Sequence, residues 1–306
     1  MTMPNFLIIG AAKAGTTSLY EYLKMHPQVY MSPRKETRFF AVYQEELNYR
    51  GPGDLTRYYF VRDLNSYRAL FEGVTNEIAI GEASPWYLYL PQAARRIKEH
   101  IPDVKLIAIL REPVARAYSH FWHSIRENIE PITDFEEAIA AEDNRIKNNW
   151  SQHWHYKQRG LYYAQLKHYY ELFKAEQIKV CLYDDLVNDP VSLMRDIYRF
   201  LGVDDRFIPN VSQKHNVAAV PKNYTLARLL KRSHPVKSLF SSFILTPKLR
   251  SLLKNYLLKL NHRSQPKLKP EMRNKLLDEY REDILKLQNL LERDLSSWLS
   301  NSFVRD

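Results

Sequence analysis

Five short runs of apolar, strand-forming residues constrain the fold of this chain most strongly. Longer segments separate these runs, and in them the apolar residues recur at helical spacing. Strands that are apolar throughout must be buried on both faces, which is typical of a parallel sheet covered by helices. We therefore predict an α/β fold of three layers, with a central parallel β-sheet flanked by helices and with ligands bound beyond the carboxyl ends of the strands. The predicted strands are residues 6–10, 28–31, 77–82, 104–110 and 178–183, and the clearest helices are residues 17–25, 91–100, 113–126 and 161–175.

Basic charge is concentrated in one part of the chain. The chain has 306 residues, of which 45% are hydrophobic, and we predict a single domain over residues 1–306. Fourteen Lys and Arg residues and no Asp or Glu lie between Arg206 and Pro270, so the rest of the chain is slightly acidic despite a net charge of +10. We expect a basic helical insertion at about residues 225–266, which either faces phosphate, sulfate, carboxylate or anionic lipid or is a solvated segment without a partner.

Two functions are compatible with the apolar runs inside this basic stretch. "SLFSSFIL" and "LLKNYLLKL" lie beside lysines and would suit peripheral membrane contact, which would admit a glycolipid, or a lid over the acceptor. We find no zinc-finger spacing, RNA-recognition signature or helix-turn-helix pattern, so no nucleic-acid partner is expected.

Cysteine use and hydropathy bear on the compartment. The one cysteine, Cys181, lies in the apolar run "IKVCLY" and is expected to be a buried, inert thiol. No run approaches the length of a membrane span, and no charged-then-apolar leader precedes the first strand. The expected location is therefore cytoplasmic.

The stretch "FLIIGAAKAGTTSLYEYL" has the order strand, glycine-containing loop, helix, which favours a P-loop-type anion site. Gly10 and Gly15 allow the backbone to approach an anion, and the amides of the following helix would point toward it. Lys13 adds a positive charge, and the hydroxyls of residues 16–18 add donors.

The position of the lysine separates two classes of ligand. A nucleoside-triphosphate loop has the pattern G-x-x-x-x-G-K-[ST], with its lysine after the second glycine. In this chain Thr16 occupies that place and Lys13 lies inside the loop, which disfavours a magnesium-triphosphate site. A P-loop nucleotide kinase is therefore the alternative and not the first choice.

The run "KAGTTSL" resembles the 5′-phosphosulfate loop of sulfotransferases that use 3′-phosphoadenosine 5′-phosphosulfate (PAPS). "LREPVARAYSHFWH" resembles the 3′-phosphate motif of the same family, and an arginine with a hydroxyl suits a terminal phosphate. "SPRKETRFF" and "GEASPWYLY" resemble further elements of the polysaccharide-type and related bacterial members, and "RGLYYAQLKHYYELF", "VCLYDDLVNDP" and "KHNVAAVPKN" follow in the family's order. The resemblance implies PAPS as donor, adenosine 3′,5′-bisphosphate (PAP) as product and no metal. The implied donor-binding residues are Lys13, Ala14, Gly15, Thr16, Thr17, Ser18, Arg111, Ser119, Lys222 and Asn223.

The resemblance also implies catalytic residues. Glu82, in the third-strand segment, is the predicted general base, because a desolvated carboxylate at a strand end can have a raised pKa. Lys13 would offset charge on the leaving oxygen, and Lys35 would either orient Glu82 or contact the leaving group. Trp86 and Tyr87 suit an acceptor pocket or the core equally well. The histidines His120, His123, His153 and His155 are interpreted as packing, acceptor-side or surface residues.

Together these features predict a PAPS-dependent sulfotransferase that acts on a hydroxyl or amine by in-line transfer. The expected acceptor is a carbohydrate, glycoconjugate or glycolipid. The alternatives are the nucleotide kinase and a non-catalytic module that binds anions or membranes through residues 206–270.

Overall fold

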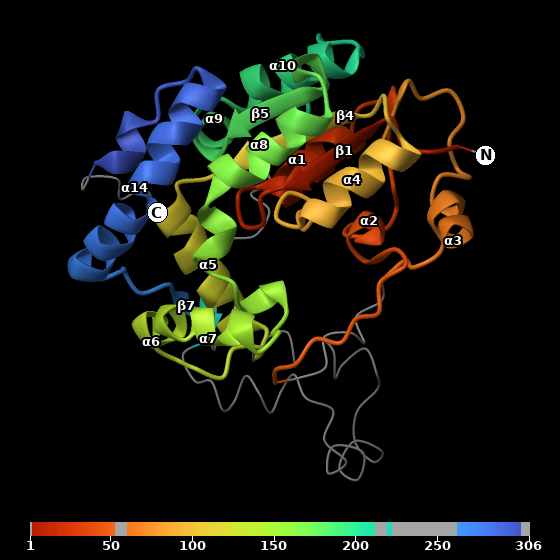
Figure 1. The fold of residues 1–306 in the computed structure, drawn as a ribbon. Coiled ribbons are helices and arrows are strands. Elements are labelled where there is room, and N and C mark those ends of the chain that lie inside the picture. Colours follow the sequence, from red (N-terminus) through yellow and green to blue (C-terminus); the bar gives the residue numbers. More distant parts are fainter. Residues whose placement is uncertain (1, 53–59, 212–218, 222–261, 301–306) are drawn as a thin grey trace, which may run out of the picture.

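The computed structural model describes residues 2–52, 60–211, 219–221 and 262–300, and its centre is a five-stranded parallel sheet (Figure 1). The strand order is β2-β3-β1-β4-β5. Every predicted strand is present, with bounds within two residues of those expected from the apolar runs. The strands are β1 (Phe6–Gly10), β2 (Val29–Met31), β3 (Ala79–Ala83), β4 (Lys105–Leu110) and β5 (Ile178–Leu182).

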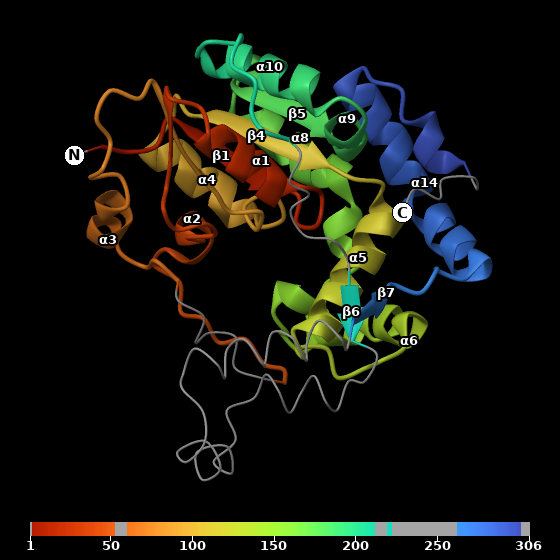
Figure 2. The same cartoon turned by 180° about the vertical axis from the view of Figure 1, so that it is seen from behind.

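Helices cover both faces of the sheet, as a three-layer fold requires. The helices α4 (Pro91–His100) and α8 (Tyr162–Leu172) pack against each other on one face (Figure 1), whereas α1 (Thr16–Lys24) covers the other (Figure 2). α10 (Pro190–Leu201) lies on the side of α1, because Tyr198 contacts His26 just beyond the end of α1. The other helices are α2 (Phe39–Val42), α3 (Leu64–Ala69), α5 (Pro113–Arg126), α6 (Phe135–Ala140), α7 (Glu142–Lys147), α9 (Tyr183–Asn188) and α14 (Pro270–Leu291).

The parallel register brings the carboxyl ends of the strands to one edge. Leu7 pairs with Glu82 on one side of β1 and with Leu106 on the other, and Leu110 at the end of β4 pairs with Leu182 at the end of β5. All five residues of β1 are buried, which accounts for its uninterrupted apolar sequence. The loops that follow the strands therefore meet at this edge, where the sequence predicts the ligand.

The N-terminus of α5 depends on Pro113 and Glu112. Proline suits the first helical turn because it has no N–H to satisfy. The Glu112 carboxylate accepts hydrogen bonds from the amides of Val114 and Ala115 at 3.2 and 2.7 Å. Arg273 of α14 donates to the same carboxylate at 3.4 Å, so the C-terminal helix is tied to the start of α5.

The predicted basic insertion at about residues 225–266 is described only at its C-terminal end. Residues 225–261 of the predicted helical insertion lie outside the described residues, but residues 262–264 form the strand β7 (His262–Ser264), antiparallel to β6 (Ala219–Pro221). Residues 143–160 contain most of α7 and two short 3₁₀ turns, Gln152–Trp154 and Gln158–Gly160. At the C-terminal end, α14 is followed by the 3₁₀ turn Ser296–Leu299, with Trp298 fully buried.

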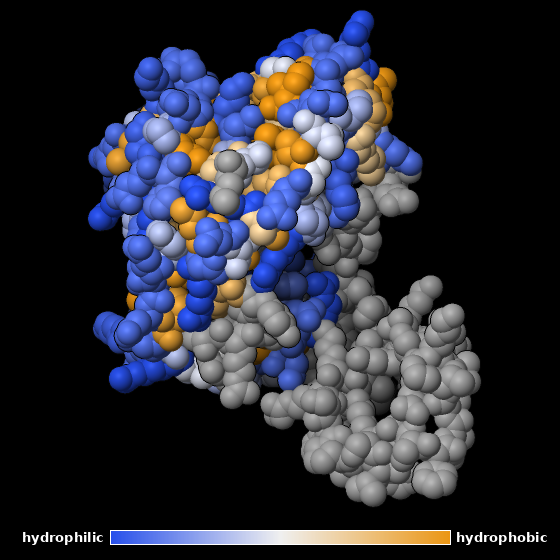
Figure 3. Space-filling view, turned by 90° about the vertical axis from the view of Figure 1, so that its right-hand side faces the viewer, coloured by the Kyte–Doolittle hydropathy of each residue, from blue (hydrophilic) through white to orange (hydrophobic). Residues whose placement is uncertain are grey.

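Large exposed hydrophobic residues are scattered over separate elements, for example Ile78 before β3, Val187 in α9 and Leu285 in α14. The face in Figure 3 likewise shows hydrophobic patches among hydrophilic residues. In the described ranges, no helix has the length and apolarity needed to cross a bilayer. Cys181 is buried, as expected.

Gly81 provides a test of the packing between β1 and β3. A Cβ at this position would lie 2.2 Å from Cζ of Phe6, a buried ring of the neighbouring strand. We expect Gly81→Ala to lower the free energy of unfolding by about 1–3 kcal/mol, because the fully buried ring has no free space to move into.

The control is Gly202→Ala, where φ is +81° but the nearest atom to a new Cβ is the flexible Lys105 Nζ at 3.9 Å. Its cost should be about 1 kcal/mol, from backbone strain alone. Urea denaturation measures both variants. The packing argument requires the larger loss in Gly81→Ala, and a loss no larger than that of Gly202→Ala would contradict it.

Candidate active site

A cavity of about 250 Å³ lies at the carboxyl edge of the sheet, beside the turn from β1 to α1. Its wall is strongly cationic: five Lys or Arg residues contribute to it, and Glu36 is the one carboxylate among the described residues that line it. A concave surface with this imbalance of charge favours an anionic ligand. The lining residues are Ala12, Lys13, Gly15, Thr16, Thr17, Ser18, Lys35, Glu36, Arg38, Pro85, Trp86, Arg111, Ser119, His120, His123, His153, Arg159 and Tyr183.

The N-terminus of α1 forms one wall of the cavity. Gly15 is its N-cap residue, with φ +96°, and no side chain caps the helix. The Leu19 amide makes the first bond of the helix, to the Gly15 carbonyl at 3.1 Å, so the amides of residues 16–18 have no carbonyl partner within the helix. Such amides, together with the positive end of the helix dipole, favour a bound anion.

Lys13 occupies the bend before this helix, in a left-handed conformation with φ +71°. Burial, together with the Arg126 and Arg111 cations, lowers the pKa of Lys13 to about 8. The ammonium group is thus held among like charges. A bound phosphate or sulfate would relieve this repulsion.

Arg111 and Ser119, the two residues of the 3′-phosphate motif, both line the cavity, on the wall formed by the end of β4 and by α5. Arg111 donates to the Lys13 carbonyl at 3.4 Å, and its guanidinium stacks 4.7 Å from the centre of the Tyr183 ring. Glu112 does not pair with it, because that carboxylate is used at the N-terminus of α5. Arg111 is therefore positioned by backbone and ring contacts, which leave donors for a ligand.

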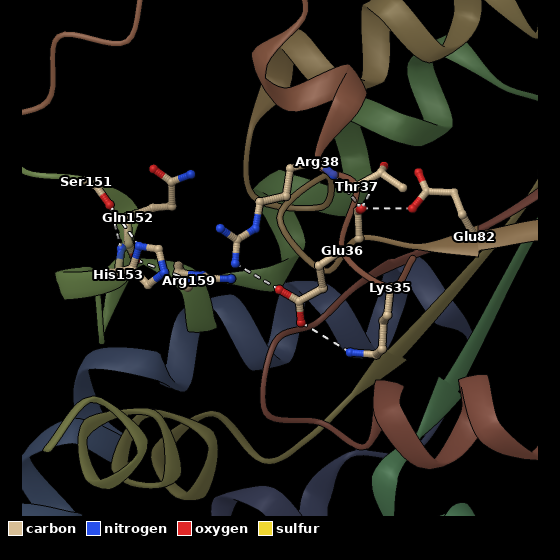
Figure 4. Close-up of polar contacts among 10 residues, drawn as sticks. Lys35, Glu36, Thr37, Arg38, Glu82, Ser151, Gln152, His153 and Arg159 are labelled. Atoms are coloured by element: carbon tan, nitrogen blue, oxygen red, sulfur yellow. Dashed lines mark hydrogen bonds and ion pairs between the residues drawn. The ribbon is translucent and has the colours of Figure 1, made fainter. Parts of the chain in front are cut away.

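Glu36 reaches the cavity from the loop after β2. Its carboxylate pairs with Lys35 at 3.2 Å and with Arg38 at 3.0 Å, and Figure 4 shows Glu36 between these two side chains. Burial alone would raise the pKa of Glu36, but the two cations outweigh it and lower the pKa to about 2. Glu36 is consequently ionised throughout the neutral range.

Glu82 lies at a different place from the one its predicted role requires. It is fully buried, it is not part of the cavity wall, and Figure 4 shows it beyond Thr37, away from Glu36. Its oxygens accept hydrogen bonds from the hydroxyls of Tyr87 at 2.6 Å, Ser84 at 2.8 Å and Tyr67 at 3.3 Å. Burial raises the pKa of Glu82 to about 7, as expected for a desolvated strand-end carboxylate, but the enclosure leaves no contact with the cavity.

The hydrogen-bond network around Glu82 holds the loop that carries Glu36. Ser84 Oγ, which donates to Glu82, accepts the Arg38 amide at 3.0 Å, and the Glu36 amide donates to the Ala83 carbonyl at 2.9 Å. Glu36 and Arg38 both have positive φ, at 59° and 56°. These hydrogen bonds fix a backbone conformation that L-residues rarely adopt.

The four histidines occupy two environments. His120 and His123 of α5 and His153 line the cavity, and burial is the main reason that the pKa of each lies below its usual value, at about 4 for His123. His155 is structural, since its ring nitrogens bond to the Tyr89 hydroxyl and to the Trp150 carbonyl at 2.8 and 3.1 Å. Across the described ranges, no three His, Cys, Asp or Glu side chains group as a metal-ion site.

The cavity brings together most of the predicted binding residues. Lys13, Gly15, Lys35, Arg111 and Ser119 line it, as do the residues at positions 16–18. Ala14 is fully buried behind the loop, so it contributes no side chain to the wall. Lys222 and Asn223 lie outside the described residues. Trp86 belongs to the wall, whereas Tyr87 belongs to the core around Glu82.

Sequence reasoning missed three charged residues of the cavity: Glu36, Arg38 and Arg159. The first two lie in the quoted segment "SPRKETRFF", where the acid next to Lys35 was the available signal. Arg159 begins the quoted segment "RGLYYAQLKHYYELF", but it follows a connection without clear periodicity, and the resemblance assigned no role to the arginine.

Comparison with known proteins places this cavity in a family context. The model of a family described as the sulfotransferase family matches residues 4–207, which include every described residue that lines the cavity. The crystal structure of a sulfotransferase from Alicyclobacillus acidocaldarius is 34% identical in sequence and superposes with a TM-score of 0.76. The match covers 98% of this chain and all of that one.

Curated relatives are similar over a smaller share. The membrane-associated sulfotransferase kil1 of Dictyostelium discoideum is 32% identical over 52% of this chain and 32% of its own length. Human heparan sulfate glucosamine 3-O-sulfotransferase 3B1 is 27% identical over 66% of this chain and 46% of its own length. The chain thus spans between about a third and a half of the length of these two relatives.

Replacing Glu82 by Gln tests its burial. The pKa of Glu82 is raised from 4.5 to about 7, so its favourable contribution to folding is complete below pH 4.5 and is lost as the pH rises through 7. Glutamine does not titrate. The free energy of unfolding of E82Q, relative to the unmodified chain, should therefore increase by about 2–3 kcal/mol from pH 5 to pH 8. Urea denaturation at both pH values measures this, and a difference independent of pH would mean that Glu82 titrates normally.

Proposed function

This chain belongs to the sulfotransferase family, and from that premise we propose that it transfers a sulfuryl group from PAPS to a hydroxyl or amine of an acceptor. The observation that carries the proposal is the cationic cavity, in which Lys13 and the uncapped N-terminus of α1 face the same space. When bound, PAPS would supply the sulfuryl group and leave as PAP.

The donor set of the cavity fits the phosphates of PAPS. Lys13 and the amides of residues 16–18 would hold the 5′ phosphate and offset the negative charge on its oxygen as the bond to sulfur breaks. Arg111 and Ser119, on the wall formed by β4 and α5, would hold the 3′ phosphate. Lys222 and Asn223 remain predicted partners of that phosphate.

Glu36 replaces Glu82 as the proposed general base. A base must reach the proton that it removes, and this requirement comes before its pKa. Glu36 is the carboxylate that lines the cavity beside Lys13 and Lys35, whereas Glu82 has the better-matched pKa but no access. The acceptor proton would pass to a Glu36 oxygen while the new bond to sulfur forms, with Arg38 and Lys35 holding the carboxylate in place.

In this proposal Glu82 affects catalysis indirectly, through the loop after β2 that carries Glu36. Its hydrogen bonds with Ser84 and Tyr87 position the backbone of residues 36–38, so it is a positioning residue for Glu36.

A saccharide is the proposed class of acceptor. The named relative 3B1 is a heparan sulfate glucosamine 3-O-sulfotransferase, and the cavity wall offers the hydrogen-bond donors that sugar hydroxyls require. A cytoplasmic location and membrane contact through residues 225–266 remain predictions from the sequence alone.

The proposed base is tested by Glu36→Gln. Because the amide cannot accept the proton, kcat for transfer of labelled sulfate from PAPS should fall by roughly 10²- to 10⁴-fold, while PAP affinity measured by calorimetry stays within a few-fold. The matched variant E82Q keeps Glu36 and should lose less than about tenfold in kcat. The reverse order of losses would restore Glu82 as the base.

The charge on Lys13 predicts a pH dependence of donor binding. With a pKa of about 8, Lys13 is charged at pH 7 and mostly neutral at pH 9. A bound phosphate raises the pKa again, so PAP should bind about tenfold more weakly at pH 9 and should take up roughly half a proton at pH 8. Calorimetry in two buffers of different ionisation enthalpy measures both effects.

Lys13→Arg is the control, because a guanidinium stays charged across this range. The variant should show neither the proton uptake nor the loss of affinity. Equal PAP affinity at pH 7 and pH 9 in the unmodified chain would mean either that Lys13 keeps its proton over this range or that it does not contact the phosphate, and the PAP affinity of Lys13→Gln at pH 7 would distinguish the two.

A further inference from the structure

Arg159 is a buried cation that the proposed reaction has not used. It lies in the 3₁₀ turn Gln158–Gly160, is only 4% exposed and lines the cavity. One of its terminal nitrogens, Nη1, donates to the Gln152 carbonyl at 3.3 Å, and the other, Nη2, has no hydrogen-bond partner in the described part of the chain.

A guanidinium in this position is costly without a counter-charge. Removing a cation from water is strongly unfavourable unless an anion or several acceptors replace the lost solvation. No carboxylate forms an ion pair with Arg159 within the described ranges, and Glu36, the carboxylate of the cavity, already pairs with Lys35 and Arg38. Burial and the nearby Arg116 cation lower the pKa of Arg159 to about 9, which reflects the same deficit of negative charge.

Arg159 lies on the opposite side of Glu36 from Lys35. Figure 4 shows the Arg159 guanidinium extending toward Arg38 and Glu36, with Lys35 beyond them. The charges that shift the two pKa values agree with this arrangement. The Glu36 carboxylate raises the pKa of both Lys13 and Arg159. The cation that lowers the pKa of Lys13 from the donor side is Arg111, whereas Arg116 and Arg38 lower the pKa of Arg159. The cavity therefore has two cationic ends with the proposed base between them.

His153 adds a donor to the Arg159 end. Ser151 Oγ accepts the His153 amide at 3.3 Å and lies 3.0 Å from Nδ1, so its hydroxyl proton is available for that nitrogen. A neutral ring that accepts at Nδ1 carries its proton on Nε2. The His153 ring lies 4.9 Å from Trp86, which borders the same space and stacks against Arg38 at 4.1 Å.

We propose that Arg159, with Arg38 and His153, binds one oxyanion of the acceptor, a carboxylate or a sulfate, next to the group that is sulfated. This inference rests on the proposed function and narrows its acceptor to acidic molecules. The phosphates of the donor are accommodated at the other end by Lys13, Arg111 and the N-terminus of α1, so the Arg159 end is left for the acceptor. An anion there would meet the unpaired Nη2 and would compensate the buried charge.

The test is calorimetric titration of the protein, saturated with PAP, with three probes that differ in one group. The probes are methyl β-glucuronide, methyl β-glucoside and methyl β-glucoside 6-sulfate. The inference predicts that a charged probe binds at least tenfold more tightly than the neutral glucoside, and the two charged probes distinguish carboxylate from sulfate. Arg159→Gln should abolish this preference, and Arg159→Lys should retain part of it.

Lys167→Gln is the matched control, because it removes one positive charge from an exposed site on α8. It should leave the preference unchanged, which excludes a general effect of net charge. Thermal melting and PAP titration of each variant verify that the fold and the donor end are intact.

Equal affinity for all three probes in the unmodified protein, or a preference that survives in R159Q, would overturn the inference. If PAP binds normally in that experiment, the proposed sulfotransferase function stands and only the acidic subsite is rejected. If the unmodified protein does not bind PAP at all, the proposed function itself fails, and the same probes titrated without PAP still report on Arg159.

Discussion

The repulsion among cations at the carboxyl edge of the sheet is the interaction on which the site depends. Five basic side chains converge on a cavity with one described carboxylate, and burial lowers the pKa of both Lys13 and Arg159. The parallel register of the strands forces this convergence, because each strand delivers its following loop to the same edge. Burial of the apolar strands stabilises the fold enough to hold these cations close together despite their repulsion, and an anionic ligand would neutralise their charge.

Two carboxylates near this edge have opposite environments. Glu36 lies between two cations in the cavity and stays ionised, whereas Glu82 is enclosed by tyrosine and serine hydroxyls and is close to half-protonated at neutral pH. The first suits contact with substrate. The second suits support of a strained loop, because a buried hydrogen-bond network holds one backbone conformation. The different roles of Glu36 and Glu82 therefore follow from the groups that surround each carboxylate.

The sequence predicts the sheet and the anion loop well, for identifiable reasons. Uninterrupted apolar runs indicate buried parallel strands, and the order Gly10, Lys13, Gly15 after such a run locates the loop within the chain. The choice between Glu36 and Glu82 needed the structure, because Glu36 follows β2, Glu82 lies near the end of β3, and both strands end at the same edge. Tyr67, which helps to enclose Glu82, comes from the preceding helix α3, and no local pattern predicts that contact. Arg159 was missed because short 3₁₀ turns have no amphipathic period.

The central claim is that this cationic cavity binds a bisphosphorylated adenylate and not a magnesium triphosphate. Calorimetric titration of the purified protein with PAP, and in parallel with adenosine 5′-monophosphate and with Mg-ATP, tests it most directly. The account predicts that PAP binds without Mg²⁺, and roughly tenfold or more tightly than the monophosphate because Arg111 and Ser119 hold the second phosphate. Tight binding of Mg-ATP together with no detectable binding of PAP would contradict it.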